Sequence, residues 1–262
     1  MSFLSTKFEY NGTSSDEMGV RLIRVGEDTI TQVLSSPKVL SRDHVKFKGN
    51  FYQGADTSFY TLSMKIMKIN EEEHFTQDDR MELLRWLNND SEFHPFIVRE
   101  DFPGIEFIVQ IVKVQFTTNA IGQGWYEIEA ESNHPYPLTS LETIEFDLSN
   151  NTGTTIIELP NNCNTASYFV PNIMEFTLVG NATSFNLKNL TNSGLVLNFN
   201  NLPLLETVSI KSSQEILTGS GVEAISKFNF GYNALEMPYG LNRLEITGKC
   251  TLKFQLQYPI QI

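Results

Sequence analysis

The stretch Lys249–Tyr258 (KCTLKFQLQY), close to the end of the chain, decides the class of fold. Apolar side chains occupy every second position of it, and lysine, threonine and glutamine fill the positions between. A period of two with one polar face is typical of a β-strand that packs on one side only. Such strands belong to antiparallel sheets in sandwiches or open barrels, so the sequence predicts a mainly β protein.

The same alternation recurs nearer the N-terminus, at 62–66 (LSMKI) and 126–131 (YEIEAE). The stretch Gly104–Phe116 also alternates but changes phase midway. One set of apolar residues comprises Ile105, Phe107, Val109 and Ile111, and a second set comprises Val112, Val114 and Phe116. We expect a bulge or sharp bend near Ile111, as happens where a strand crosses between sheets.

One helix is predicted, over about 77–89. Thr76 can cap it, and Asp79 lies three residues on, in the position of a capping box. Asp78 adds negative charge at the positive end of the helix dipole. The expected apolar stripe consists of Leu83, Leu84 and Leu87, widened by Met81 and Trp86.

Composition excludes several classes of protein. The 262 residues are 40% hydrophobic and 19% charged, which excludes general disorder. The formal net charge of −12 opposes tight binding of nucleic acid through a basic face. No run of about 18 apolar residues occurs, and the N-terminus lacks the basic-then-apolar pattern of a signal peptide, so we expect a soluble protein that is not exported. Two cysteines make no disulfide framework, and we expect both as free thiols.

The composition shifts at His134-Pro135-Tyr136-Pro137, where two prolines in three residues stiffen the chain. After this point asparagine becomes abundant, and histidine and tryptophan are absent. We therefore expect one domain over 1–137 and a second over 138–262.

The motifs of several enzyme classes are missing from the sequence. There is no G-x-S-x-G, no G-x-x-x-x-G-K-[ST], no H-E-x-x-H and no paired C-x-x-C. The run Glu71–His74 (EEEH) could hold a metal, but a solvated loop leading into the helix is the favoured interpretation. We expect no catalytic residue, no cofactor and no metal, and hence no enzyme.

Six stretches, in their order and separation, resemble the distal tail proteins of siphophage-type phages. They are Phe8–Val20 (FEYNGTSSDEMGV), Arg80–Leu87 (RMELLRWL), Phe96–Glu100, Gly122–Glu129 (GQGWYEIE), Pro135–Pro137 and Tyr239–Gly248 (YGLNRLEITG). The chain departs from the family in two places. Pro238 stands one residue further from its glycine than is usual, and Gly26–Ser41 matches poorly.

The resemblance implies a first domain that is a β-sandwich or split barrel with one helix, and that closes as six copies into a ring. A segment at about 41–60 would belt the neighbouring copy, with Gly49–Ser58 (GNFYQGADTS) as its centre. Aromatic residues gather there and would anchor an interface, although an ordinary hairpin with core aromatics is the alternative. The candidate belt residues are Phe51, Tyr52, Phe59 and Tyr60.

The resemblance further implies a C-terminal galectin-like, or carbohydrate-module-like, β-sandwich. The ring would lie in the virion at the tail tip, after synthesis and assembly in the bacterial cytoplasm. It would join the tail tube to tail-tip and receptor-binding proteins and let genomic DNA pass. Two alternatives remain: a carbohydrate-binding accessory protein that contacts the host surface, and a cell-wall hydrolase. The second domain has no histidine and no tryptophan, and its arginine, Arg243, is expected in the closing turn, which favours protein docking over sugar binding.

Overall fold

The computed structural model divides the chain into two compact units, each described by itself below. The first comprises Met1–Thr139 with Ile260–Ile262, and the second comprises Ser140–Pro259. The structure describes residues 4–23, 38–45, 49–57, 59–70, 73–88, 91–118, 124–165, 168–212, 216–218, 228–229 and 232–261. The last residues of the chain thus belong to the first unit, whereas the sequence placed them in the second domain.

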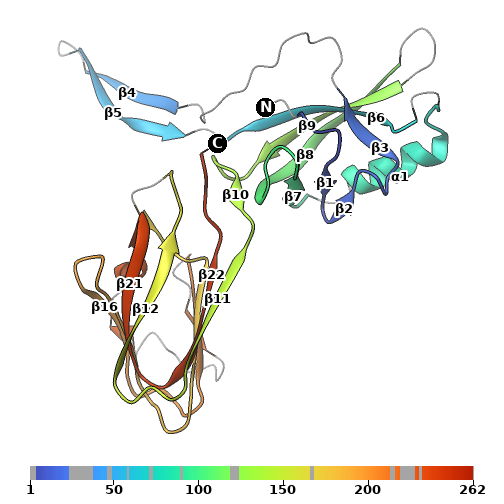
Figure 1. The fold of residues 1–262 in the computed structure, drawn as a ribbon. Coiled ribbons are helices and arrows are strands. Elements are labelled where there is room, and N and C mark those ends of the chain that lie inside the picture. Colours follow the sequence, from blue (N-terminus) through green and yellow to red (C-terminus); the bar gives the residue numbers. More distant parts are fainter. Residues whose placement is uncertain are drawn as a thin grey trace. The chain divides into compact units, whose positions relative to one another are not determined.

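The first unit is built on one eight-stranded antiparallel sheet (Figure 1). Its strands are β1 (Glu9–Tyr10), β2 (Thr13–Ser14), β3 (Val20–Ile23), β6 (Thr61–Lys68), β7 (His94–Ile97), β8 (Ile105–Thr118), β9 (Gly124–Ser132) and β10 (Leu138–Thr139). They follow the order β2-β1-β7-β8-β9-β6-β3, with β10 paired to β8. A separate two-stranded sheet holds β4 (Lys38–Val45) and β5 (Gly49–Thr57).

The two ends of the large sheet meet. The backbone N–H of Leu22 on β3 donates to the carbonyl of Thr6 at 2.8 Å, and that of Val20 donates to Ser15 at 2.9 Å. Thr6 and Ser15 flank β1 and β2, which form the opposite end of the strand order. The sheet therefore curls round a core of Phe96, Phe107, Leu62, Ile66, Ile128 and their neighbours. The prediction of a sandwich or split barrel with one helix is confirmed.

The phase change predicted near Ile111 is a bulge in β8. Its pairing with β9 shifts register between Ile111 and Lys113. Val112 is the extra residue, and its side chain is 50% exposed. The prediction of a bend is confirmed, but Val112 does not begin the second apolar face, because the bulge turns it outward. Val114 and Phe116 do pack against the core.

Helix α1 (Gln77–Leu87) begins as the sequence predicts. The Thr76 hydroxyl accepts from the backbone N–H of Asp79 at 3.2 Å, and the Asp79 carboxylate accepts from the N–H of Thr76 at 2.7 Å. This reciprocal pair satisfies two of the N–H groups that a helix leaves without partners. Lys68 on β6 also reaches the Asp79 carboxylate at 2.7 Å and so ties the cap to the sheet.

The buried stripe of α1 is narrower than the sequence predicts. Leu83 and Leu87 are buried, whereas Leu84 is 44% and Met81 is 55% exposed. The expected apolar stripe of Leu83, Leu84 and Leu87, widened by Met81 and Trp86, is thus only partly buried, because the helix packs on the curled sheet along one row of turns. Trp86 is half-buried, and its indole N–H donates to the Tyr10 carbonyl at 3.0 Å.

The second unit is a β-sandwich of two five-stranded antiparallel sheets, and a two-stranded pair accompanies it. The first sheet has the order β11 (Glu142–Leu148), β22 (Cys250–Leu256), β14 (Ile173–Leu178), β17 (Thr207–Lys211) and β18 (Ile216–Thr218). The second has the order β12 (Thr154–Asn161), β21 (Gly240–Thr247), β15 (Phe185–Asn189), β16 (Leu195–Phe199) and β19 (Phe228–Asn229). The pair is β13 (Tyr168–Phe169) with β20 (Met237–Pro238), and a short 3-10 helix covers Tyr232–Leu235.

The alternation in Lys249–Tyr258 corresponds to one buried face, which points into the core of the sandwich. Cys250, Leu252, Phe254, Leu256 and Tyr258 are all buried. The predicted β-sandwich is confirmed, while its likeness to galectins in particular stays a prediction. Cys250 and the other cysteine, Cys163, are both free and buried, as predicted, and burial raises the pKa of the Cys250 thiol to about 11.

Buried asparagines explain part of the asparagine content of this unit. Asn161 donates to the Met237 carbonyl at 2.8 Å, and Asn189 donates to the carbonyls of Ala234 and Glu236 at 3.0 and 3.1 Å. A buried amide supplies both donors and an acceptor, so it can satisfy an irregular backbone segment inside a core. These side chains hold the end of the 3-10 helix and the residues that follow it.

The capping box generates a prediction about the first unit. Replacing Asp79 by Asn should lower its free energy of unfolding by about 1 kcal/mol at pH 7. The bonds from Lys68 and Thr76 lower the pKa of Asp79 to about 2. Its contribution is therefore complete above the unfolded pKa near 3.9 and is lost as the pH falls towards 2. Urea unfolding across this pH range measures it. Asp78→Asn is the control: it removes a charge from the same turn but no capping bond, and an equal loss would contradict the prediction.

A glycine in the β21–β22 turn generates a second prediction. Gly248 has a φ of +128°, and a Cβ there would lie 2.9 Å from the Ser184 carbonyl oxygen. Gly248→Ala should therefore destabilise the second unit by about 2 kcal/mol or more. Gly153→Ala is the matched control, because Gly153 has open space around it and no positive φ. Thermal unfolding compares the two variants, and similar melting temperatures would rule the prediction out.

Candidate assembly surfaces

The β4–β5 hairpin has no partner sheet in the described part of the chain. The two strands pair antiparallel from Lys38 with Thr57 to Val45 with Gly49, and a register shift lies between Ser41 and Arg42. A two-stranded hairpin without a packing partner is at best marginally stable in water. This segment is therefore the clearest candidate for a contact with another protein.

The four candidate belt residues lie in three places: on the hairpin, directly after it, and against the core of the first unit. Phe51 and Tyr52 lie on β5, with Asp43 and Arg42 as their Cα partners on β4. Phe59 follows the hairpin and is 64% exposed.

Tyr60 belongs to the body of the first unit. Its ring contacts Phe107 edge-on at 6.0 Å, and its backbone N–H donates to the Ser132 hydroxyl at 3.0 Å. Burial raises the pKa of its hydroxyl well above the usual value. Tyr60 thus fixes the base of the segment to its own chain, which leaves the hairpin and Phe59 as the candidate contact.

The face of β9 turned away from the core carries a row of acids. Glu127, Glu129 and Glu131 alternate with the buried Tyr126, Ile128 and Ala130. Lys65 on β6 lies 3.6 Å from Glu127, and Lys113 on β8 lies 2.8 Å from Glu129. Two lysines thus face three carboxylates. Along β9, carboxylates thus outnumber the lysines paired with them, which opposes binding of a phosphate backbone to this row.

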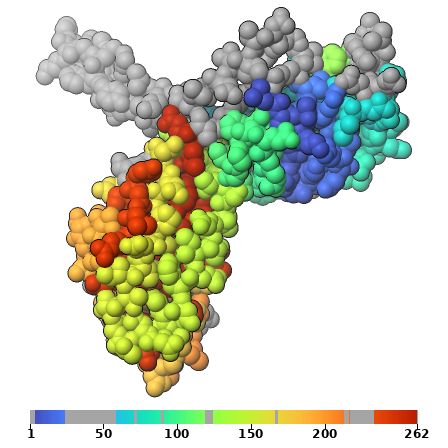
Figure 2. All heavy atoms as spheres, viewed as in Figure 1, coloured from blue at the N-terminus to red at the C-terminus, as the bar shows by residue number. Residues whose placement is uncertain are grey.

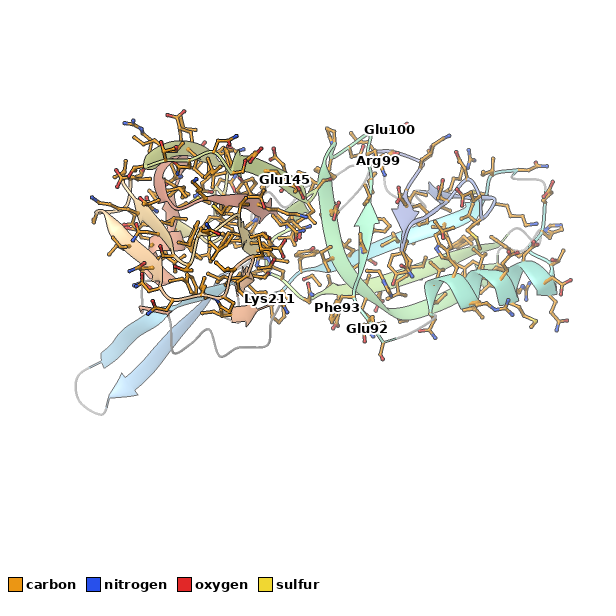
Figure 3. All side chains as sticks on the ribbon, turned by 90° about the horizontal axis from the view of Figure 1, so that it is seen from below. Glu92, Phe93, Arg99, Glu100, Glu145 and Lys211 are labelled. Atoms are coloured by element: carbon orange, nitrogen blue, oxygen red, sulfur yellow. The ribbon has the colours of Figure 1, made fainter. Side chains whose placement is uncertain are left out.

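Side chains near one end of β7 are bonded within the first unit, whereas an aromatic ring before the other end is partly exposed (Figure 3). Beyond one end, Arg99 pairs with Glu9 at 2.7 Å, and Glu100 accepts from the Ser5 hydroxyl at 2.9 Å. Before the other end lies Phe93, next to Glu92, and its ring is partly exposed. Arg99 and Glu100 are thus both bonded to other residues of the first unit, whereas the partly exposed ring of Phe93 adds apolar surface to that unit.

The second unit has an open depression between its two edge strands, β11 and β12. Lining residues are Glu145, Phe146, Asp147, Leu148, Thr155, Ile156, Ile157, Glu158 and Arg243. Arg243 lies within β21, 3.8 Å from Glu158, and not in a turn as the sequence predicted. Lys253 approaches Glu145 at 3.9 Å. Phe146, which is half-buried and packs edge-on against Phe254 at 6.3 Å, is the aromatic residue among those that line the depression.

No group of three or more metal-ligating side chains occurs in the residues that the structure describes. Of the run Glu71–His74, residues 71 and 72 lie outside that part. The helix α1 spans 11 residues, and no helix of the described ranges is long and apolar enough to cross a membrane.

Family models for phage tail proteins match almost the entire chain. A phage tail protein N-terminal domain matches residues 3–134, and a phage tail C-terminal domain matches residues 136–256. The chain belongs to this family of phage tail proteins. The resemblance seen in the sequence is thereby confirmed.

A curated relative and two solved structures agree with the family. The chain is 24% identical over 258 residues to the SPbeta prophage-derived uncharacterized protein YomH of Bacillus subtilis (strain 168), covering 97% of both chains. Its fold matches the Dit (gp 19.1) hub protein of phage SPP1 with a TM-score of 0.66 at 13% identity, over 96% of this chain and 98% of that one. A chain of the phage P2 baseplate in its activated conformation matches with a TM-score of 0.53 at 10% identity, over 98% and 99%. At such low sequence identities, the two structural matches show a shared fold alone.

The acidic face of this tail protein generates a third prediction. Replacing Glu127, Glu129 and Glu131 together by Lys should create binding to duplex DNA that is strong at about 50 mM salt and lost near 200 mM. The wild-type chain should show none. Because the ion pairs with Lys65 and Lys113 are exposed, each should contribute at most about 1 kcal/mol to stability, and the variant should still fold. DNA-column retention measures the effect; the Gln triple variant is the control, and its retention at the same salt would contradict the prediction.

Proposed function

We propose that this phage tail protein is a structural, non-catalytic component of the tail tip, where copies of it close into a ring-shaped hub. The observation that carries the proposal is the β4–β5 hairpin. Its two strands pair with each other and with no other sheet of the described chain, in a protein that shares the fold of a tail hub.

The hairpin supplies what a ring needs. A ring of identical chains requires two different, complementary faces on each copy, so that contacts run head to tail. The hairpin of one copy is one face, and the body of the first unit in the next copy is the other. Extended arms that add to a neighbour gain both backbone hydrogen bonds and apolar burial. Phe51, Tyr52 and Phe59 provide aromatic area for that burial. Six copies per ring follow from the resemblance to distal tail proteins.

The charge of the chain suits a ring through which DNA passes. The formal net charge is −12, and the sheet face on β9 carries a surplus of carboxylates. DNA next to such surfaces releases no counterions and gains no binding energy, so it can slide. In this proposal the ring joins the tail tube on one side to tail-tip and receptor-binding proteins on the other. It is made and assembled in the host cytoplasm and becomes part of the virion.

The experiment that tests the hub is the absolute mass of the purified protein by light scattering at several concentrations. We expect a mass near six times 29.8 kDa that persists on dilution. Replacing residues 38–57 by a short Gly-Ser linker should reduce the mass to that of a single chain. The Phe51→Ser/Tyr52→Ser double variant should weaken the ring, because two interface aromatics are lost.

Phe93→Ser is the matched control, since it removes an exposed aromatic of the first unit outside the hairpin. An unchanged mass after removal of the hairpin would refute the proposal that the hairpin joins neighbouring copies. A wild-type monomer that binds glycans would overturn the hub and favour a carbohydrate-binding accessory protein.

A further inference from the structure

Four described loops of the second unit gather at one end of the sandwich. They are 149–153, 179–184, 200–206 and 248–249, which join β11 to β12, β14 to β15, β16 to β17 and β21 to β22. Strand register places them together, because Leu148 and Leu178 both pair with Cys250, and Thr177 pairs with Thr207. The chain enters and leaves the unit at the opposite end, where Glu142 pairs with Leu256. We call this set of loops the tip (Figures 1 and 2).

Hydrogen bonds join the four loops into one rigid surface. Loops 200–206 and 179–184 are linked by the bond from the Leu202 N–H to the Thr183 carbonyl, at 2.9 Å. The Val179 N–H donates to the Lys249 carbonyl at 2.9 Å, and the Asn151 amide donates to the Gly248 carbonyl at 3.2 Å. Each loop is thus bonded to another, and the tip is ordered before any partner arrives. A surface ordered in advance loses little entropy on binding.

Two adjacent leucines project from this rigid surface. Leu204 is 58% and Leu205 is 66% exposed, between Leu202 and Glu206, which are both buried. Leu205 has a φ of +58°, a left-handed conformation that is strained for a bulky side chain. Its neighbours hold it there: Leu202 packs into the core, and the Glu206 carbonyl accepts from the Leu178 N–H at 2.9 Å. The fold therefore accepts both strain and exposed apolar area at one position, a combination found at binding sites.

The surroundings of the two leucines are almost free of charge. Of the charged side chains in these four loops, Lys249 is exposed and Glu206 is buried. The other exposed positions are asparagine, threonine, serine, glycine and leucine, as at Asn150, Asn181 and Asn201. This contrasts with the acidic chain as a whole. Short amide and hydroxyl side chains around an apolar anchor form an adaptable, neutral contact surface.

We infer that the tip is a docking surface on which Leu204 and Leu205 insert into an uncharged apolar pocket of another tail protein. This inference rests on the chain's membership of a tail assembly but not on the ring proposed above. A protein partner fits better than a saccharide, because the four loops contain no aromatic ring on which a sugar could stack. The aliphatic pair provides the buried centre of the interface, and the asparagines provide a hydrogen-bonding rim.

The test uses the full-length chain and the other tail-tip proteins of the same phage, purified one at a time. Surface plasmon resonance should find a partner for the wild type whose affinity falls at least about tenfold with Leu205→Asn. Asparagine tolerates the left-handed conformation, so this variant should keep or raise the melting temperature. A side chain with only a structural role would not give weaker binding together with equal or higher stability.

Leu241→Asn is the matched control, because Leu241 is 59% exposed on β21, outside the tip, and should leave the affinity unchanged. Equal affinities of wild type and Leu205→Asn for every partner would overturn the inference, as would the absence of any partner for the wild type. Loss of binding to purified bacterial cell walls, with protein partners unaffected, would also overturn it and indicate a saccharide surface. Light scattering on the same samples gives the mass of the assembly. A loss of docking can therefore be told apart from a loss of the ring.

Discussion

The long strands in the large sheets of the two units each bury one face, and both units depend on that constraint. A strand covered on one side must find its cover in its own sheet, in a second sheet or in a helix. The first unit solves this by curling one sheet until residues beside β1 and β2 bond to β3, with α1 packed along one row. The second unit solves it by facing two sheets across a common core. Polar side chains are left outside in both cases, and every exposed apolar group then stands out against them.

Local patterns in the sequence were enough to predict much of this fold. The alternation in Lys249–Tyr258, the bulge beside Ile111 and the box formed by Thr76 and Asp79 depend on neighbours within a few residues, so the sequence contains them. The width of the buried stripe on α1 does not, because the exposure of Met81 and Leu84 follows from the curvature of a sheet assembled from distant strands. The tertiary partners of Asn161 and Asn189 were beyond reach for the same reason. Sequence showed that asparagine was frequent but not that these amides hold a buried backbone segment.

The candidate assembly surfaces likewise include a part that the sequence could predict and a part that only the tertiary structure shows. An aromatic segment at 51–60 could be recognised from composition, but only the pairing of strands separates Tyr60, packed on Phe107, from the hairpin that lacks a partner. The pair Leu204 and Leu205 gave no signal in the sequence, where two adjacent leucines are ordinary core residues. The left-handed backbone at Leu205 and the burial of Leu202 and Glu206 on either side turn them outward.

The return of the chain to the first unit has a further consequence. The Ile260 N–H donates to the Pro137 carbonyl at 2.9 Å, so the chain leaves the first unit and rejoins it at neighbouring points. Topologically the sandwich is an insert in a continuous first unit, with its entry and exit side by side. Because entry and exit are adjacent, another domain whose two ends lie close together could replace the sandwich without breaking the first unit. Such an exchange between phages would replace the surface formed by the four loops and leave the fold of the first unit unchanged.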